Sequence, residues 1–120
     1  ILLEVLRYDS PIQNTRRFVA RDGIIAGQEI KTGDVILVVL AAANYDLSVN
    51  PNPDQFDPLR QNRRSFTFGL GTHACPGETL AVSIAKAGLE QLFNMDILLQ
   101  QLTQTITYRH STNTRIPLFI

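Results

Sequence analysis

The sequence has 120 residues, of which 44% are apolar and 18% are charged, and its 11 Lys and Arg residues balance 11 Asp and Glu residues. A chain of this length forms one domain or part of one, and the composition is that of a globular protein rather than a disordered one. The balanced charge gives no sign of nucleic-acid binding. The single cysteine excludes an internal disulfide and any metal site that needs several cysteines.

The first 46 residues predict a short helix, small sheets and a helical turn. Residues 1–8 (ILLEVLRY) predict a helix that ends before Pro11, with Glu4 and Arg7 spaced to meet on its surface. Residues 16–20 predict a strand, and residues 22–34 predict tight hairpins. The apolar run 34–40 predicts a strand covered on both faces, and residues 41–46 predict one helical turn. Because the helical pattern starts at Ile1, we expect a piece of a longer protein.

The second half predicts an irregular segment, a long helix and a strand-rich tail. Residues 47–65 carry three prolines and no period, so we expect an ordered irregular surface segment. Residues 76–94 predict a helix with Pro76 in its first turn. Residues 96–120 predict two or three strands with a turn at 111–114. The predicted class is α+β. The longest apolar run, residues 35–43, is too short for a membrane segment.

The only cysteine, Cys75, stands in a glycine-rich stretch, FTFGLGTHACPGE (residues 66–78), here named the Cys loop. Three interpretations are open. Cys75 is a small buried hydrophobe, or a nucleophile paired with His73 in a thiol-dependent hydrolase, although no third orienting group is evident. In the third interpretation it is a thiolate ligand, and haem iron needs only one such axial protein ligand. The free N–H groups at the start of the following helix favour a thiolate.

Five positions in and beside this loop decide among these interpretations, because they follow the pattern F-x-x-G-x-H-x-C-x-G. This pattern resembles the haem-binding signature of the cytochrome P-450 family, and its residues are Phe68, Gly71, His73, Cys75 and Gly77. Three further segments resemble the family in the same order. They are EVLR at residues 4–7, the strand segment 10–22, and the pair AAANYD and NPDQFDPLR at residues 41–46 and 52–60.

The resemblance extends over residues 1–120 and implies the C-terminal, haem-ligating portion of a single cytochrome P-450 domain, without its N-terminal part. Its parts are helix K, small sheets, the meander, the Cys-ligand loop, helix L and a C-terminal hairpin. Glu4 and Arg7 match the E-x-x-R pair that holds the meander in the family; the alternative is an exposed helix pair. Two departures concern the meander: Gln55 stands where an Arg, His or Asn is usual, and Tyr45 stands where Arg is common.

The resemblance also implies roles for the site residues around haem b. Cys75 is expected to be the catalytic axial ligand, with the backbone amides of Gly77 and Glu78 donating to its sulfur. Phe68 is expected to screen the sulfur from water, while Gly71 and Gly77 let the loop approach the cofactor. Arg17 and His73 are expected to bind the haem propionates. Possible substrate contacts lie on two segments, at Ile12 and Gln13 and at Arg109 and His110.

The function that the resemblance implies is a monooxygenase, which in the complete protein inserts one atom of O2 into a small organic substrate. His73 and the SPIQ segment are similar to soluble bacterial members, which implies a ferredoxin and reductase as electron donor and a cytoplasmic location. The alternative is an orphaned or degenerate fragment that acts at most as a binding or assembly module. We expect the isolated 120 residues to be inactive and to self-associate or need the N-terminal part.

Overall fold

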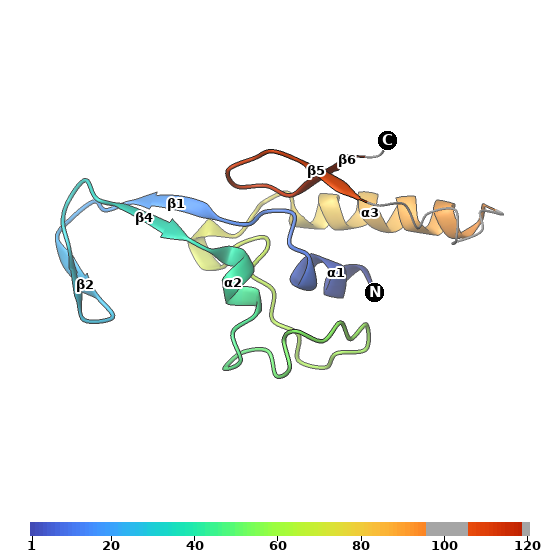
Figure 1. Ribbon diagram of the computed structural model, residues 1–120, viewed down its shortest axis with the longest axis horizontal. Coiled ribbons are helices and arrows are strands. Elements are labelled where there is room, and N and C mark those ends of the chain that lie inside the picture. The colour runs from blue at the N-terminus through green and yellow to red at the C-terminus, as the bar shows by residue number, and fades with distance from the viewer. Residues whose placement is uncertain (96–105, 119–120) are drawn as a thin grey trace.

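The computed structural model describes residues 1–95 and 106–118. Figure 1 shows an elongated molecule with one long helix toward one end and a small hairpin at the other. In chain order the elements are α1 (Leu2–Tyr8), β1 (Thr15–Phe18), β2 (Gly23–Ile25), β3 (Gln28–Ile30), β4 (Val35–Val38), α2 (Leu40–Asn44), the 3-10 turn η1 (Gly71–His73), α3 (Glu78–Phe93), β5 (Thr107–Arg109) and β6 (Ile116–Leu118). The α+β class is confirmed, and residues 47–65 form neither helix nor strand, as predicted.

The described strands form three separate antiparallel pairs, β1 with β4, β2 with β3 and β5 with β6. The β2–β3 pair is the predicted hairpin, and it turns through Ala26 and Gly27, whose φ angles are 50° and 81°. Two successive positive φ values give the turn the twist that a two-residue hairpin needs. This hairpin lies at the far end of the molecule from α3 (Figure 1).

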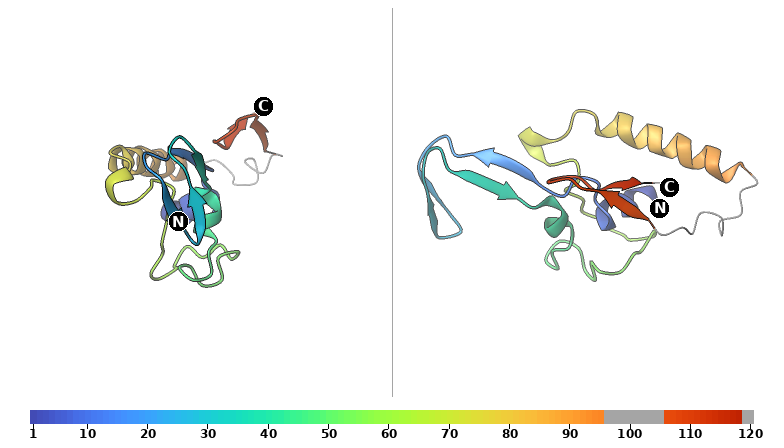
Figure 2. Two further views of the ribbon diagram at one scale, coloured as in Figure 1. Left: turned by 90° about the vertical axis from the view of Figure 1, so that its left-hand side faces the viewer. Right: turned by 45° about the horizontal axis from the view of Figure 1, so that its top comes forward.

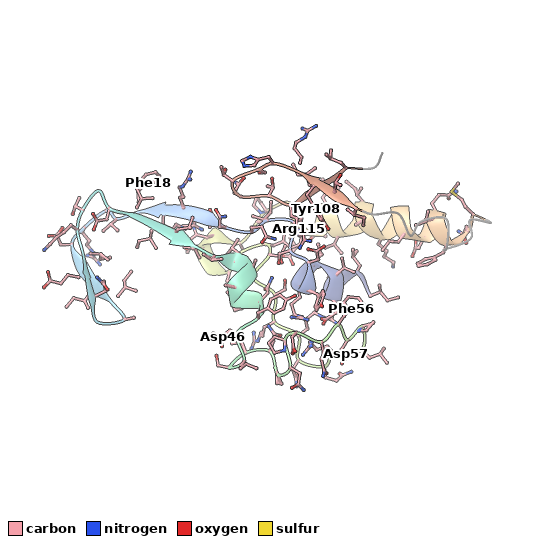
Figure 3. The ribbon with its side chains drawn as sticks, viewed as in Figure 1. Phe18, Asp46, Phe56, Asp57, Tyr108 and Arg115 are labelled. Carbon is pink, nitrogen blue, oxygen red and sulfur yellow. The ribbon has the colours of Figure 1, made fainter. Side chains whose placement is uncertain are left out.

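Strand β4 corrects the prediction for residues 34–40. Its side chains alternate: Val35 and Leu37 are 55% and 54% exposed, while Ile36 and Val38 are half-buried. The expected cover on both faces is therefore wrong for the described chain. The sheet has only two strands, and Phe18, which pairs with Val35, is exposed on the same face (Figure 3).

Helix α3 begins two residues later than the sequence predicts. Gly77 is the residue before the helix, and its carbonyl oxygen accepts a bond from Ala81 N–H at 2.9 Å. Pro76 lies in the preceding turn, so its expected place in the first helical turn is wrong. Glu78 N–H donates to the Cys75 carbonyl oxygen at 3.3 Å, a bond between residues three apart that closes the turn before the helix.

The C-terminal hairpin β5–β6 confirms the predicted strands and turn after residue 106, whereas predictions for 96–105 and 119–120 lie outside the described residues. Its turn pairs with the segment that follows α1. Ile12 bridges Thr114, Gln13 N–H donates to the Asn113 carbonyl at 2.8 Å, and Arg115 N–H donates to the Pro11 carbonyl at 2.8 Å. Arg115 of this segment lies 2.8 Å from Asp9, which follows α1, and the right view of Figure 2 shows the hairpin close to that helix.

Little apolar surface is buried within the chain. The radius of gyration is 17.4 Å, whereas a compact domain of this length has about 14 Å. The accessible surface is 9434 Å², against about 6,500 Å² for a folded monomer of this mass. Among the described apolar side chains only Val19 and Pro53 are buried; the fully buried large side chains are the polar ones of Glu4, Arg7, Asn44 and Asn50. No helix among the described residues is long and apolar enough to cross a membrane.

Candidate functional site

The polar core is centred on the carboxylate of Glu4. One turn of α1 places Glu4 and Arg7 on the same side, and both side chains have no exposed surface. Arg7 Nη2 lies 2.7 Å from Glu4 Oε1, Arg60 Nε lies 3.1 Å from the same oxygen, and Arg63 Nε lies 2.7 Å from Oε2. The backbone N–H of Asp57 donates to Oε1 at 3.2 Å. The interpretation of Glu4 and Arg7 as an exposed helix pair is therefore wrong.

Arg7 extends the cluster into the irregular segment through backbone carbonyls. Its Nη1 donates to Pro53 at 2.8 Å and to Asn44 at 3.2 Å, and its Nη2 donates to Gln55 at 3.2 Å. The rings of Tyr8 and Tyr45 lie 5.7 and 5.5 Å from its guanidinium carbon, a distance at which the ring faces attract a cation. Figure 3 shows Phe56 and Asp57 beside α1.

The two departures at Gln55 and Tyr45 are compensated in this structure. Gln55 contributes its carbonyl oxygen, while Arg60 and Arg63 supply the guanidinium groups that Glu4 binds. Tyr45 donates its hydroxyl to the Tyr8 carbonyl oxygen at 2.7 Å. Sequence reasoning gave Arg60 and Arg63 no contact with Glu4, although Arg60 ends the segment NPDQFDPLR that resembles the family's meander.

The environment of Glu4 strongly favours the charged carboxylate. Burial by itself raises the pKa of Glu4, but hydrogen bonds from Arg7, Arg63, the Asp57 backbone and Arg60 together outweigh it. The pKa of Glu4 is therefore held well below its usual range. The cluster remains ionised at every physiological pH.

A second polar set attaches the Cys loop to α1 and α2. Phe66 N–H donates to Asn44 Oδ1 at 2.7 Å, and Thr67 Oγ1 donates to the Leu6 carbonyl at 2.6 Å. Asn44 Nδ2 also donates to Thr67 Oγ1 at 3.1 Å. Asn50 bridges to the backbone of Arg64 through both ends of its side-chain amide, at 2.9 and 3.0 Å. Sequence reasoning gave Asn44, Asn50 and Thr67 no role.

The Cys loop is a closed turn. Cys75 N–H donates to the Phe68 carbonyl at 2.7 Å, across the 3-10 turn η1. Gly69 has φ +70°, and a Cβ built there would lie 2.6 Å from the His73 carbonyl oxygen. Gly69 is therefore required by both conformation and space, although the predicted site residues included only Gly71 and Gly77. A Cβ at Gly77 would lie 3.7 Å from Cys75 Sγ, an ordinary contact.

Cys75 itself is free and exposed, so its interpretation as a buried hydrophobe is wrong. His73 is also exposed, and no hydrogen bond joins it to Cys75 Sγ in the described residues, so the structure does not assemble a nucleophile–base pair. The expectation that Glu78 N–H donates to the sulfur is wrong here, because that N–H donates to the Cys75 carbonyl oxygen. The exposed sulfur is thus open to an external partner.

Comparison with known proteins explains this arrangement. Residues 1–110 match the family model described as cytochrome P-450. The chain belongs to the cytochrome P-450 family. It is 46% identical over 90 residues to a cytochrome P-450 of Bacillus subtilis, covering 74% of this chain and 22% of that protein. It is 39% identical over 90 residues to the 6-deoxyerythronolide B hydroxylase of Saccharopolyspora erythraea, covering 75% and 22%.

Solved structures of the family agree with the fold. The crystal structure of P450BioI in complex with hexadec-9Z-enoic acid ligated acyl carrier protein has a TM-score of 0.82 and 35% identity, and covers 95% of this chain and 30% of that one. The chain thus spans about a fifth of the length of the curated relatives it matches. Membership of the cytochrome P-450 family implies a haem-iron cofactor.

The residues around the Cys loop fit such a cofactor. A single exposed thiol in a rigid glycine loop matches the single protein ligand that haem iron takes. Arg17 is half-buried and binds only Thr15 Oγ1 at 3.0 Å and the Arg16 carbonyl at 2.8 Å, so it has no carboxylate partner among the described residues. Within residues 1–95 and 106–118, no group of three or more His, Cys, Asp or Glu side chains gathers to hold a metal ion.

The remaining predicted site residues divide into two places. Phe68 lines a cavity of about 240 Å³ with the five other residues Leu3, Leu6, Arg63, Ser65 and Glu78. The predicted substrate contacts are brought together from the two ends of the chain, because the segment that holds Ile12 and Gln13 pairs with the hairpin turn that follows Arg109 and His110. Arg17 lies on β1, which continues from the first of these segments.

Proposed function

We propose that this chain is the C-terminal, haem-ligating portion of a single monooxygenase domain, with Cys75 as the axial ligand of haem b. The observation that carries the proposal is the exposed Cys75 sulfur, presented by a loop that Gly69 and the 2.7 Å bond from Cys75 N–H to Phe68 hold closed. A thiolate fixed in this way needs no rearrangement of the chain to reach an iron ion. When bound, haem supplies activation of O2 with electrons from a redox partner.

The other residues hold and orient this ligand. Arg17 and His73 provide cations for the two propionates, and Gly71 and Gly77 keep bulk away from the loop. Phe68 fixes the loop through its carbonyl oxygen, and in this proposal its side chain screens the Cys75 sulfur from water. The buried Glu4–Arg7 cluster holds the meander against α1, which supports the base of the Cys loop.

The substrate in this proposal is a small organic molecule that contacts Ile12, Gln13, Arg109 and His110. The hydroxylase among the relatives supports insertion of one oxygen atom into such a molecule. The electron donor in this proposal is a ferredoxin with its reductase and the location is cytoplasmic, as the similarity of His73 and the SPIQ segment to soluble bacterial members implies. In this reading the remainder of the domain covers the other side of the haem and supplies the proton-delivery residues.

The exposed surface favours a second candidate for the 120 residues in isolation, a non-catalytic fragment that acts at most as a binding or assembly module. Its accessible surface of 9434 Å² exceeds that of a folded monomer of equal mass by nearly half. Exposed apolar area of this extent drives association. We expect the isolated fragment to elute as an oligomer in size-exclusion chromatography and to show no oxygenase turnover.

Oxygen incorporation separates the two candidates. The complete protein, loaded with haem and supplied with ferredoxin, reductase, NADPH and a panel of organic substrates under ¹⁸O2, is expected to yield a product that contains one ¹⁸O atom. Hydrolysis of the substrate panel by the apoprotein, measured before and after treatment with iodoacetamide, tests the earlier interpretation as a thiol hydrolase. Hydrolysis that is lost on alkylation, with no ¹⁸O incorporation by the haem-loaded protein, would overturn the proposal.

A further inference from the structure

We infer that the substrate of this protein carries a carboxylate, which Arg109 binds on the outer face of the C-terminal sheet. The inference rests on the proposed function and names the chemical class of its substrate. It is based on the difference between the side chains on the two faces of one small sheet.

Three segments form this sheet. Arg109 of β5 pairs with Ile116 of β6, and Thr114, at the start of the same extended stretch, pairs with Ile12. Directly opposed residues of an antiparallel pair project from the same face, as do residues two apart on one strand. Ile12, Thr114, Ile116 and Arg109 therefore share one face. Leu118 continues that face along β6.

The other face is already occupied by α1. Tyr108, Arg115 and Pro117 line a cavity of about 300 Å³ together with residues of α1 and its C-terminal end, Val5, Leu6 and Asp9 among them. Arg115 Nη1 lies 2.8 Å from Asp9 Oδ1, and its guanidinium carbon lies 4.2 Å from the centre of the Tyr108 ring. Figure 3 shows Tyr108 and Arg115 next to each other below the hairpin. The charges on this face are thus paired.

The outer face has the opposite character. Ile12, Ile116 and Leu118 are exposed on it, and Arg109 is exposed between them with no carboxylate of the described residues within ion-pair distance. Asp9, the carboxylate that forms an ion pair with this sheet in the described chain, is held on the other face by Arg115. The outer face therefore carries three apolar side chains, the two threonines Thr107 and Thr114, and the single positive charge of Arg109.

This combination selects an occupant of particular chemistry. A planar guanidinium binds a carboxylate through two parallel hydrogen bonds, whereas an uncharged group offers no such match. Ile116 lies directly opposite Arg109, and Leu118 follows about 7 Å further along the same face of β6, so an apolar surface extends from Arg109 toward the end of that strand. A small organic acid with a hydrocarbon body satisfies both the charge and the apolar surface at once.

The test uses the complete, haem-loaded protein and two matched pairs of probes, decanoate with 1-decanol and 2-naphthoate with 2-naphthol. Binding is measured by calorimetry at pH 7. Each carboxylate is expected to bind about 10- to 100-fold more tightly than its uncharged partner, the range that one charge-assisted contact gives. Arg109→Gln is expected to abolish this preference, Arg109→Lys to reduce it, and the control Arg16→Gln, an exposed arginine on β1, to leave it unchanged.

Equal affinity for charged and uncharged probes, or binding of none of the four, would overturn the inference. An Arg109→Gln protein that keeps the preference for carboxylates would also overturn it. If that protein in addition loses stability in urea, the outer face packs against the rest of the domain instead of binding substrate. The ferrous–CO spectrum of the same samples separates the two claims. An intact thiolate spectrum with no carboxylate preference rejects only this inference, whereas an absent spectrum rejects the proposed function.

Discussion

Replacing Glu4 by Gln removes the one carboxylate on which three guanidinium groups converge. Gln is nearly the same size, so the change removes charge and leaves the volume of the side chain. Its amide N–H2 group also faces N–H donors of Arg7, Arg60 or Arg63 where an oxygen accepted bonds before. Breaking a buried ion pair by neutralising one partner costs about 3–5 kcal/mol, because it leaves an uncompensated buried charge. We expect a loss of unfolding free energy in that range.

Urea denaturation of the complete protein at pH 7 measures this loss from the midpoint and slope of the transition. The matched control is Glu29→Gln, which neutralises an exposed carboxylate 3.8 Å from Lys31 and is expected to leave the midpoint unchanged. A loss below about 1 kcal/mol for Glu4→Gln would show that the cluster does not stabilise the fold and would refute the reasoning.

The same pair of proteins predicts a pH dependence. The pKa of Glu4 is lowered in the folded state, so its stabilising effect is complete above the unfolded pKa of about 4.3 and declines as pH falls toward the folded pKa. The unfolding free energy of the wild-type protein should therefore fall more steeply below about pH 5 than that of Glu4→Gln. Parallel curves for the two proteins would contradict this cause.

Four further substitutions test other parts of the site. Gly69→Ala is expected to lower the unfolding free energy by at least about 1 kcal/mol and to weaken haem retention, because its Cβ meets the His73 carbonyl. The control Gly23→Ala has open space around it and should melt at the wild-type temperature. Equal melting temperatures for the two variants would refute the steric argument. Tyr45→Phe keeps the ring over Arg7 and removes the hydroxyl that donates to the Tyr8 carbonyl. We expect the unfolding free energy from urea titrations to fall by about 0.5–1.5 kcal/mol. No fall would mean that this bond does not stabilise the fold. Arg17→Ala and His73→Ala are each expected to speed haem transfer to apomyoglobin, and unchanged transfer in both would remove them from the propionate contacts.

Local signals in the sequence predicted most of the elements. The apolar spacing of residues 1–8 and 80–93, the Ala26-Gly27 turn and the glycine-rich Cys loop each depend on neighbours within a few positions, and α1, α3 and the two hairpins follow them. The start of α3 was missed because Pro76 suits a first turn equally well, and only the bond from Glu78 N–H to Cys75 shows which residue the helix begins at.

The parts that sequence reasoning missed are long-range. Arg60 and Arg63 lie 56 and 59 residues from Glu4 along the chain, and no local pattern links them to it. Nothing in the sequence distinguishes Asn44 and Thr67 from other polar residues; the fold brings Asn44 of α2 within hydrogen-bond distance of Thr67 in the Cys loop. The exposed face of β4 was predicted as covered because a continuous apolar run is typical of a strand with neighbours on both faces.

The ferrous–CO absorption spectrum of the complete, haem-loaded protein tests the central claim most directly. Wild-type protein and Thr72→Ala, which alters an exposed side chain of the same loop, are expected to show the red-shifted Soret band of thiolate ligation. Cys75→Ala is expected to lose that band, with bound haem quantified in parallel. A red-shifted band that survives in Cys75→Ala, or a wild-type spectrum without it, would contradict the assignment of Cys75 as the ligand of haem iron.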